Sequence, residues 1–238
     1  MYQEYKAAWA ALTAPGADFE VTTTNVRGVD IKTYANALTN LRDAWVSTAA
    51  YAEREYIVYE DERLTYTQAH EHVNSLGNWL IGQGVQPGDR VAIAMRNYPE
   101  WILSYWAILS VGATVVGMNA WWTGPEMLYA LEDSTPKAII ADEERLATLN
   151  SIRAKLANLV VIGVRVPGSP AVTPWSDVIA APTPMPEIAI DPDSDACIFY
   201  TSGTTGNPKG AQLTHRGCTT NIWSLMFAAA LQRVLAVQ

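Results

Sequence analysis

The chain has 238 residues, of which 49% are hydrophobic and 17% charged, a composition typical of a globular protein with a sizeable core. Its formal net charge is −8, which argues against a nucleic-acid partner, because binding without sequence preference needs clustered Lys and Arg. The two cysteines, Cys197 and Cys218, are too few for a disulfide framework and suit a reducing compartment such as the cytoplasm.

Neither the first twenty residues nor the uncharged stretch 101–125 has the pattern of a targeting or membrane-spanning segment. The first twenty residues carry charges early and lack the apolar run of a secretory signal. Residues 101–125 contain no charged residue and are long enough to cross a bilayer. Because Gly112, Gly117, Asn119 and Pro125 interrupt this stretch, we expect a buried helix, a turn and a buried strand there, and no transmembrane span.

Apolar strands and amphipathic helices alternate along the chain. A strand is expected at 55–60, then a turn at 61–63 and a helix at 68–83, whose start Thr65 and Gln68 can cap. The capping-box pair Thr123 and Glu126 predicts the start of another helix. Further strands are expected at 90–95, 113–118, 137–142, 159–166 and 196–202, and further helices at 99–109, between 142 and 155, and at 214–231.

This alternation predicts an α/β fold with a mostly parallel sheet and helices on both faces. Ligands of such folds bind at the carboxyl ends of the strands. We expect an N-terminal αβ subdomain at 1–166 and a proline-rich connector at 167–192, with one short helix near 175–179. The segment 193–238 is expected to begin a second αβ part.

The segment 200–210, "YTSGTTGNPKG", has the composition of a phosphate-binding loop. Glycines at 203, 206 and 210 allow close approach by a ligand, and successive N–H groups in such turns bind anions. Hydroxyl groups and Lys209 add donors and positive charge, and the loop is expected to have a strand leading in and a helix leading out. The spacing excludes both a Walker A loop and a G-x-G-x-x-G fingerprint.

The segment "YTSGTTGNPKG" resembles the phosphate-binding signature of the adenylate-forming superfamily, which includes acyl-CoA synthetases, adenylation domains and luciferases. Further segments at 88–101, 112–127, 131–142 and 213–215 resemble the same family in the same order. The segment "MNAWWT" (118–123) is more similar to acyl-CoA ligases for fatty or related acids than to peptide-synthetase domains.

The resemblance implies that a carboxylic acid reacts with ATP and Mg²⁺ to give acyl-AMP and pyrophosphate, after which the CoA thiol displaces AMP. It implies a role in fatty acid metabolism. Thr201 is a candidate ligand near Mg²⁺, and Lys209 assists without being the family's catalytic lysine. The residues that the resemblance assigns to the ATP phosphates are Thr201, Ser202, Gly203, Thr204, Thr205, Gly206 and Lys209.

Other residues receive structural interpretations. His215 is expected to start or pack a helix, and core packing is favoured over an acyl pocket for Trp121 and Trp122. Asn97, Pro99 and Glu100 resemble family positions that form a strand-to-helix turn. His70 and His72 are two residues apart, which on a helix points them in different directions and disfavours a metal pair.

The adenine-binding and ribose-binding motifs of the family, and its C-terminal domain with the catalytic lysine, are not found in these residues. We therefore expect an N-terminal fragment that does not make acyl-AMP by itself. The alternative is a non-catalytic αβ module that binds phosphate weakly or forms a homo-oligomer through an exposed apolar surface.

Overall fold

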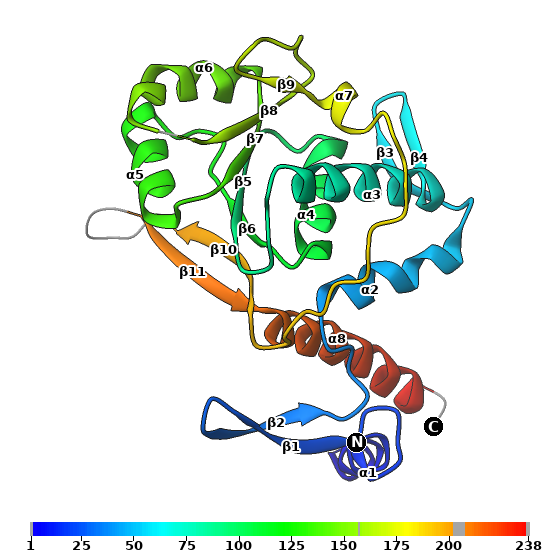
Figure 1. The fold of residues 1–238 in the computed structure, drawn as a ribbon. Coiled ribbons are helices and arrows are strands. Elements are labelled where there is room, and N and C mark those ends of the chain that lie inside the picture. Colours follow the sequence, from blue (N-terminus) through cyan, green and yellow to red (C-terminus); the bar gives the residue numbers. More distant parts are fainter. Residues whose placement is uncertain (1, 157, 202–207, 237–238) are drawn as a thin grey trace.

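The computed structural model describes residues 2–156, 158–201 and 208–236. Its centre is a seven-stranded sheet in the order β11–β10–β6–β5–β7–β8–β9, in which only the β10–β11 pair is antiparallel (Figure 1). The expected α/β fold with a mostly parallel sheet is therefore confirmed. The strands are β5 (Arg90–Ala94), β6 (Thr114–Gly117), β7 (Ala138–Asp142), β8 (Val160–Val164), β9 (Thr173–Pro174), β10 (Asp195–Thr201) and β11 (Lys209–Thr214).

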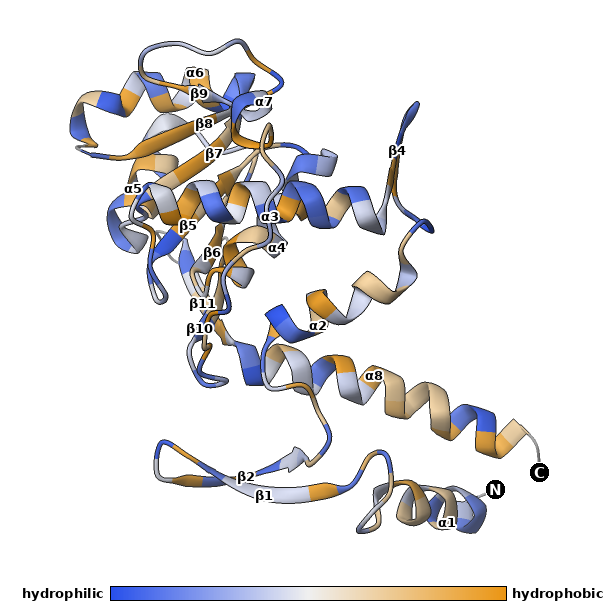
Figure 2. Cartoon of the chain, turned by 45° about the vertical axis from the view of Figure 1, so that its right-hand side comes forward, coloured by the Kyte–Doolittle hydropathy of each residue, from blue (hydrophilic) through white to orange (hydrophobic). Residues whose placement is uncertain are grey.

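Helices cover both faces of the sheet because its central strands are apolar on both sides. On β5, Val91 and Ile93 join one core cluster, whereas Ala92 and Ala94 join the other. Figure 2 shows the central strands as hydrophobic along most of their length. The first cluster contains residues of α3 (Tyr66–Gly82) and α4 (Pro99–Ser110), and the second contains residues of α5 (Gly124–Ser134) and α6 (Glu143–Ile152).

Both predicted capping boxes are confirmed. At the start of α3, the Gln68 N–H donates to Thr65 Oγ1 (3.3 Å) and the Thr65 N–H donates to Gln68 Oε1 (2.9 Å). At the start of α5, both the N–H and the hydroxyl of Thr123 donate to Glu126 Oε2, each at 2.8 Å. These contacts satisfy backbone donors that a helix start leaves without partners.

The uncharged stretch 101–125 forms most of α4, then β6, and then the start of α5. The prediction of a buried helix, a turn and a buried strand is thus confirmed, since Leu103, Ile108 and Val115 are at most 1% exposed. Within the described residues, no helix is both long enough and apolar enough to span a bilayer.

Two predicted connections are wrong. The turn predicted at 61–63 lies instead at Glu60 and Asp61, because β4 (Glu62–Thr65) already pairs antiparallel with β3 (Glu55–Tyr59). The chain after the glycine-rich loop is also not directly helical, because β11 pairs with β10 before α8 (His215–Ala236) begins. A Cβ atom at Gly210 would lie 2.8 Å from Ile198 Cγ2, so this glycine permits the close pairing of the two strands.

The first forty residues form an element that packs on the last helix (Figure 1). It consists of α1 (Tyr2–Thr13) and the antiparallel strands β1 (Val21–Val26) and β2 (Val29–Tyr34). Trp9 and Phe19 contact Phe227 of α8, with ring centroids 4.6 and 5.5 Å apart. The remaining helical segments are α2 (Leu41–Ser47), the 3₁₀ turns η1 (Thr48–Tyr51) and η2 (Arg153–Lys155), and α7 (Trp175–Val178).

Candidate functional site

The β10–β11 hairpin carries Thr201 and Lys209, the two predicted phosphate contacts that lie within the described residues. Thr201 ends β10 and lies directly opposite Lys209, the first residue of β11. The Thr201 hydroxyl donates to the Lys209 carbonyl at 3.4 Å, and both residues are exposed. The hairpin therefore presents one hydroxyl group and one ammonium group at the carboxyl end of β10. The other predicted contacts, Ser202, Gly203, Thr204, Thr205 and Gly206, lie outside the described residues.

A second site lies where the chain changes direction across the sheet. The connection after β5 leads through α4 to β6 on one side, and the connection after β7 leads through α6 to β8 on the other. Since β5 and β7 are neighbours, the crevice beyond their carboxyl ends is a topological switch point, a usual ligand site of α/β folds. A pocket of about 480 Å³ opens there. Its lining residues are Tyr59, Met95, Arg96, Asn97, Tyr98, Ala120, Trp121 and Glu144.

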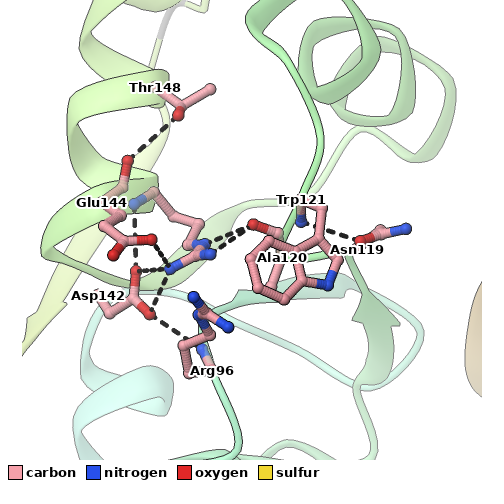
Figure 3. Close-up of polar contacts among 8 residues, drawn as sticks. Arg96, Asn119, Ala120, Trp121, Asp142, Glu144 and Thr148 are labelled. Carbon is pink, nitrogen blue, oxygen red and sulfur yellow. Dashed lines mark hydrogen bonds and ion pairs between the residues drawn. The ribbon is translucent and has the colours of Figure 1, made fainter.

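A buried ion pair holds together two of the segments that line this switch-point pocket (Figure 3). The Asp142 carboxylate caps α6 by accepting the Arg145 N–H (3.1 Å), and it also accepts the Arg96 N–H (2.9 Å). Arg145 Nη1 lies 3.1 Å from Asp142 Oδ2, and the two side chains are only 5% and 6% exposed. Two further nitrogens of Arg145 donate to the Ala120 carbonyl at 2.6 and 2.7 Å. The pair thus ties the ends of β5 and β7 to the segment after β6.

An indole and a guanidinium group face each other at the mouth of the pocket. The Arg96 guanidinium carbon lies 3.8 Å from the centre of the Trp121 ring, which is within the range of a cation–π contact. Trp121 is nevertheless 70% exposed, so the prediction that it packs in the core is wrong. The backbone N–H of Trp121 donates to Asn119 Oδ1 (2.9 Å), which orients the segment at the pocket (Figure 3). A flat exposed ring beside a cation suits a planar anionic ligand such as a nucleotide.

Trp122 connects the switch-point pocket to the hairpin. It is half-buried against the second core cluster, and its ring meets Tyr200 edge to face at 5.6 Å, so its predicted packing role is confirmed. The Tyr200 hydroxyl donates to Asp133 Oδ2 of α5 at 2.6 Å. Since Trp121 precedes Trp122 and Thr201 follows Tyr200, the two candidate sites lie beside each other at the same edge of the sheet.

Arg165, just after β8, holds the aromatic wall of the pocket. It pairs with Glu62 of β4 (2.8 Å) and with Glu100 in the first turn of α4 (3.1 Å). Its guanidinium carbon also lies 5.3 Å from the ring centre of Tyr59 and 4.8 Å from that of Tyr98. Glu100 therefore has a structural role, as expected, and Pro99 begins α4 as predicted. Asn97, in contrast, lines the pocket as well as the turn.

His215 is the first residue of α8 and is completely buried. Its Nδ1 accepts the Leu41 N–H at 3.2 Å, and burial lowers its pKa to about 4. The imidazole is consequently neutral at pH 7 and joins α8 to α2. The prediction that His215 starts and packs a helix is confirmed.

The sequence reasoning did not identify the switch-point pocket, because its key residues share no compact motif. Arg96, Trp121 and Arg145 follow three different strands. The available signal was positional: charged and aromatic side chains come directly after apolar strands whose carboxyl ends must share one edge. Within the described ranges, no cluster of three or more His, Cys, Asp or Glu side chains could hold a metal ion.

Comparisons with known proteins identify the family of the chain. The model of the family described as AMP-binding enzyme matches residues 44–237. The chain belongs to this family. A crotonobetaine/carnitine–CoA ligase of Salmonella enteritidis is 29% identical over 188 residues, which are 74% of this chain and 36% of that protein. The chain thus spans about a third of this curated relative's length.

Two solved structures extend the likeness to the fold. The anthranilate CoA ligase AuaEII in complex with anthranoyl-AMP superposes with a TM-score of 0.71 at 28% identity, covering 74% of this chain and 35% of that one. The N-terminal domain of FACL13 from Mycobacterium tuberculosis gives a TM-score of 0.64 at 26% identity, covering 75% and 45%. The family model begins at residue 44, so α1, β1 and β2 precede the matched region.

Proposed function

We propose that this chain is part of an acid–thiol ligase that uses ATP to activate a carboxylic acid and then transfers the acyl group to CoA. The observation that carries this proposal is the match of residues 44–237 to the AMP-binding enzyme family, whose relatives found here are CoA ligases. The segment "MNAWWT" (118–123) supports a fatty or related acid as the substrate. The net charge of −8 supports the absence of a nucleic-acid partner, and the sparse cysteines support a cytoplasmic location.

The proposed chemistry requires control of negative charge, because a carboxylate must attack the α-phosphorus of a polyanion. We assign the phosphates to the loop at the tip of the β10–β11 hairpin. The Lys209 ammonium group and the Thr201 hydroxyl would contact them from its two strands, together with Ser202, Gly203, Thr204, Thr205 and Gly206 of the loop. The Thr201 hydroxyl is an oxygen ligand of the kind that Mg²⁺ binds, and oxygens of the ATP phosphates would supply further ligands. Bound Mg²⁺ would offset phosphate charge.

The switch-point pocket supplies a second place for a nucleotide. Arg96 offers a positive charge, and Trp121 offers a stacking surface for a purine ring. Since the hairpin is assigned to the ATP phosphates, we assign this pocket to the nucleotide part of CoA. Titrating variants of each site with adenosine 3′,5′-bisphosphate and with ATP distinguishes the two assignments. Substitutions in the pocket should weaken the binding of adenosine 3′,5′-bisphosphate, and substitutions on the hairpin should weaken the binding of ATP.

We also propose that these 238 residues do not make acyl-AMP by themselves, since they span only about a third of the ligase to which they are similar. ATP–pyrophosphate exchange, measured with a panel of fatty and aromatic acids, tests this point. We expect no exchange above a Lys209→Met control, together with measurable binding of MgATP by calorimetry. Robust exchange would contradict the inactivity, and the absence of MgATP binding would contradict the phosphate assignment.

A second candidate, a non-catalytic module that self-associates, is favoured by one observation. Leu225 and Met226 of α8 are 65% and 49% exposed, and Ile222 is 36% exposed on the same helix. A second copy of the chain could cover this apolar face. Light scattering separates the two candidates: a monomer that binds MgATP supports the ligase, and an oligomer that binds none supports the module.

A further inference from the structure

The two cysteines of the chain, far apart in the sequence, meet in the fold. Cys197 lies on β10, four residues before Thr201, and Cys218 lies in the first turn of α8. The start of α8 is held against the start of β10 by backbone hydrogen bonds from His215 to Ser194 (3.1 Å) and from Arg216 to Pro192 (2.6 Å). Cys218, in turn, packs against the core cluster that contains Cys197. Both cysteines are in the free thiol state.

The two thiols have unequal surroundings. Cys197 is completely buried, and its sulfur lies 3.4 Å from the Tyr105 hydroxyl of α4. Cys218 is only half-buried, and it sits at a helix start where the Gly217 N–H donates to Thr214 Oγ1 (3.1 Å). A helix N-terminus favours a thiolate over a thiol. Cys218 is therefore placed as the accessible nucleophile, and Cys197 as the protected second thiol beside it.

The acid–base properties agree with this division. The neighbouring Cys197 thiol lowers the pKa of the Cys218 thiol to about 7, whereas the Cys218 sulfur and burial raise the pKa of Cys197. An attacking thiol works best when its pKa lies near the ambient pH. A low-pKa accessible cysteine next to a second thiol is also the arrangement that converts a mixed disulfide into an internal one.

We propose that Cys218 and Cys197 form an oxidisable dithiol that reacts with low-molecular-weight disulfides. The Cys218 thiolate attacks one sulfur of the disulfide R–S–S–R, forms a mixed disulfide and releases one thiolate RS⁻. The Cys197 sulfur then attacks Cys218, loses its proton and releases the second RS⁻. The protein dithiol is oxidised and R–S–S–R is reduced to two thiols. The new bond would join β10, the strand that enters the phosphate loop, to α8.

Oxidised glutathione is the probe for this reaction, and intact-mass spectrometry is the readout. The chain has only two cysteines, so every change in mass reports on this pair. For the unaltered chain we expect an internal disulfide, seen as the loss of two hydrogens, with the glutathione adduct only transient. Cys197→Ser should accumulate one stable glutathione adduct, because the second step is removed. Cys218→Ser should react at least tenfold more slowly than the unaltered chain, since the accessible nucleophile is gone.

Several results would overturn the proposal. These are a persistent glutathione adduct on the unaltered chain, disulfide-linked dimers in place of an internal bond, or no reaction at all. Equal reactivity of Cys197→Ser and Cys218→Ser would also contradict the assigned order of attack. Circular dichroism of both variants verifies that they are folded. Tyr105→Phe keeps the ring and removes only the hydroxyl, and should still form the internal disulfide, because neither sulfur is altered.

Discussion

The switch-point pocket and the β10–β11 hairpin lie at the same edge of the sheet but are built in opposite ways. Beneath the pocket, Asp142 and Arg145 are about 95% buried, and each of them joins several segments. At the hairpin, Thr201 and Lys209 are exposed and share one long hydrogen bond of 3.4 Å. The pocket is thus preorganised by buried charges, whereas the described residues of the hairpin are free to adjust to a ligand.

This difference affects how a substitution acts in each region. A change beneath the pocket alters stability first, because it leaves a buried charge without its partner. A change on the hairpin alters ligand binding first, because its exposed side chains contribute little to folding.

The largest effect is expected for Asp142→Asn, beneath the pocket. The substitution leaves the Arg145 guanidinium buried with no carboxylate except exposed Glu144, so we expect the free energy of unfolding to fall by about 3–5 kcal/mol. Urea denaturation followed by circular dichroism measures this loss. Glu144→Gln is the matched control: its carboxylate is 70% exposed, and its loss should cost at most about 1 kcal/mol. Equal losses for both variants would show that the segments lining the pocket are not held by the buried pair.

The second prediction concerns pH and the base of the hairpin, where His215 follows β11. Burial lowers the pKa of His215 to about 4 in the folded chain, below its unfolded value of about 6.5. The unfolded chain therefore binds more protons between these values, and stability falls as the pH falls through this window. We expect a loss of about 2 kcal/mol between pH 7 and pH 5 from this one group.

Urea denaturation at both pH values tests this expectation with His215→Asn, which does not titrate. Burial also lowers the pKa of His70 and His72, so the variant should retain a smaller pH dependence of the same sign. A variant as sensitive to pH as the unaltered chain would contradict the account. His215→Asn also distinguishes the hairpin from the pocket, because the substitution changes no residue that lines the pocket.

The same contrast explains what could be predicted from the sequence. Strands such as 90–94 and the caps at Thr65 and Thr123 follow from local apolar runs and hydrogen-bonding partners three residues apart. The hairpin's loop was found because its residues are consecutive. The exposure of Trp121 was missed, because apolar composition predicts burial and only the fold places Arg96 against its ring. Strand β11 was missed because its pairing with β10 depends on contacts across a loop.

The third prediction separates binding from stability at the pocket. Trp121→Ala removes an exposed stacking surface, so we expect about a tenfold weaker affinity for adenosine 3′,5′-bisphosphate, since base stacking contributes about 1–3 kcal/mol. The free energy of unfolding should change by no more than about 0.5 kcal/mol. Calorimetric titration and urea denaturation measure the two quantities. Trp121→Phe keeps a ring and should recover most of the affinity, and unchanged binding by Trp121→Ala would argue against the pocket as a nucleotide site.

The smallest effect is expected on the hairpin. Lys209→Met removes one exposed ammonium group, and we expect MgATP to bind about threefold to fivefold more weakly, because an exposed charge contact contributes up to about 1 kcal/mol. Lys155→Met is the matched control, since Lys155 is also exposed but lies near the amino end of β8, at the opposite edge of the sheet. Calorimetry at low and high salt should show the difference shrinking as salt screens the charge. Equal affinities for the two variants would mean that Lys209 does not contact the phosphates and that the hairpin's exposure has another role.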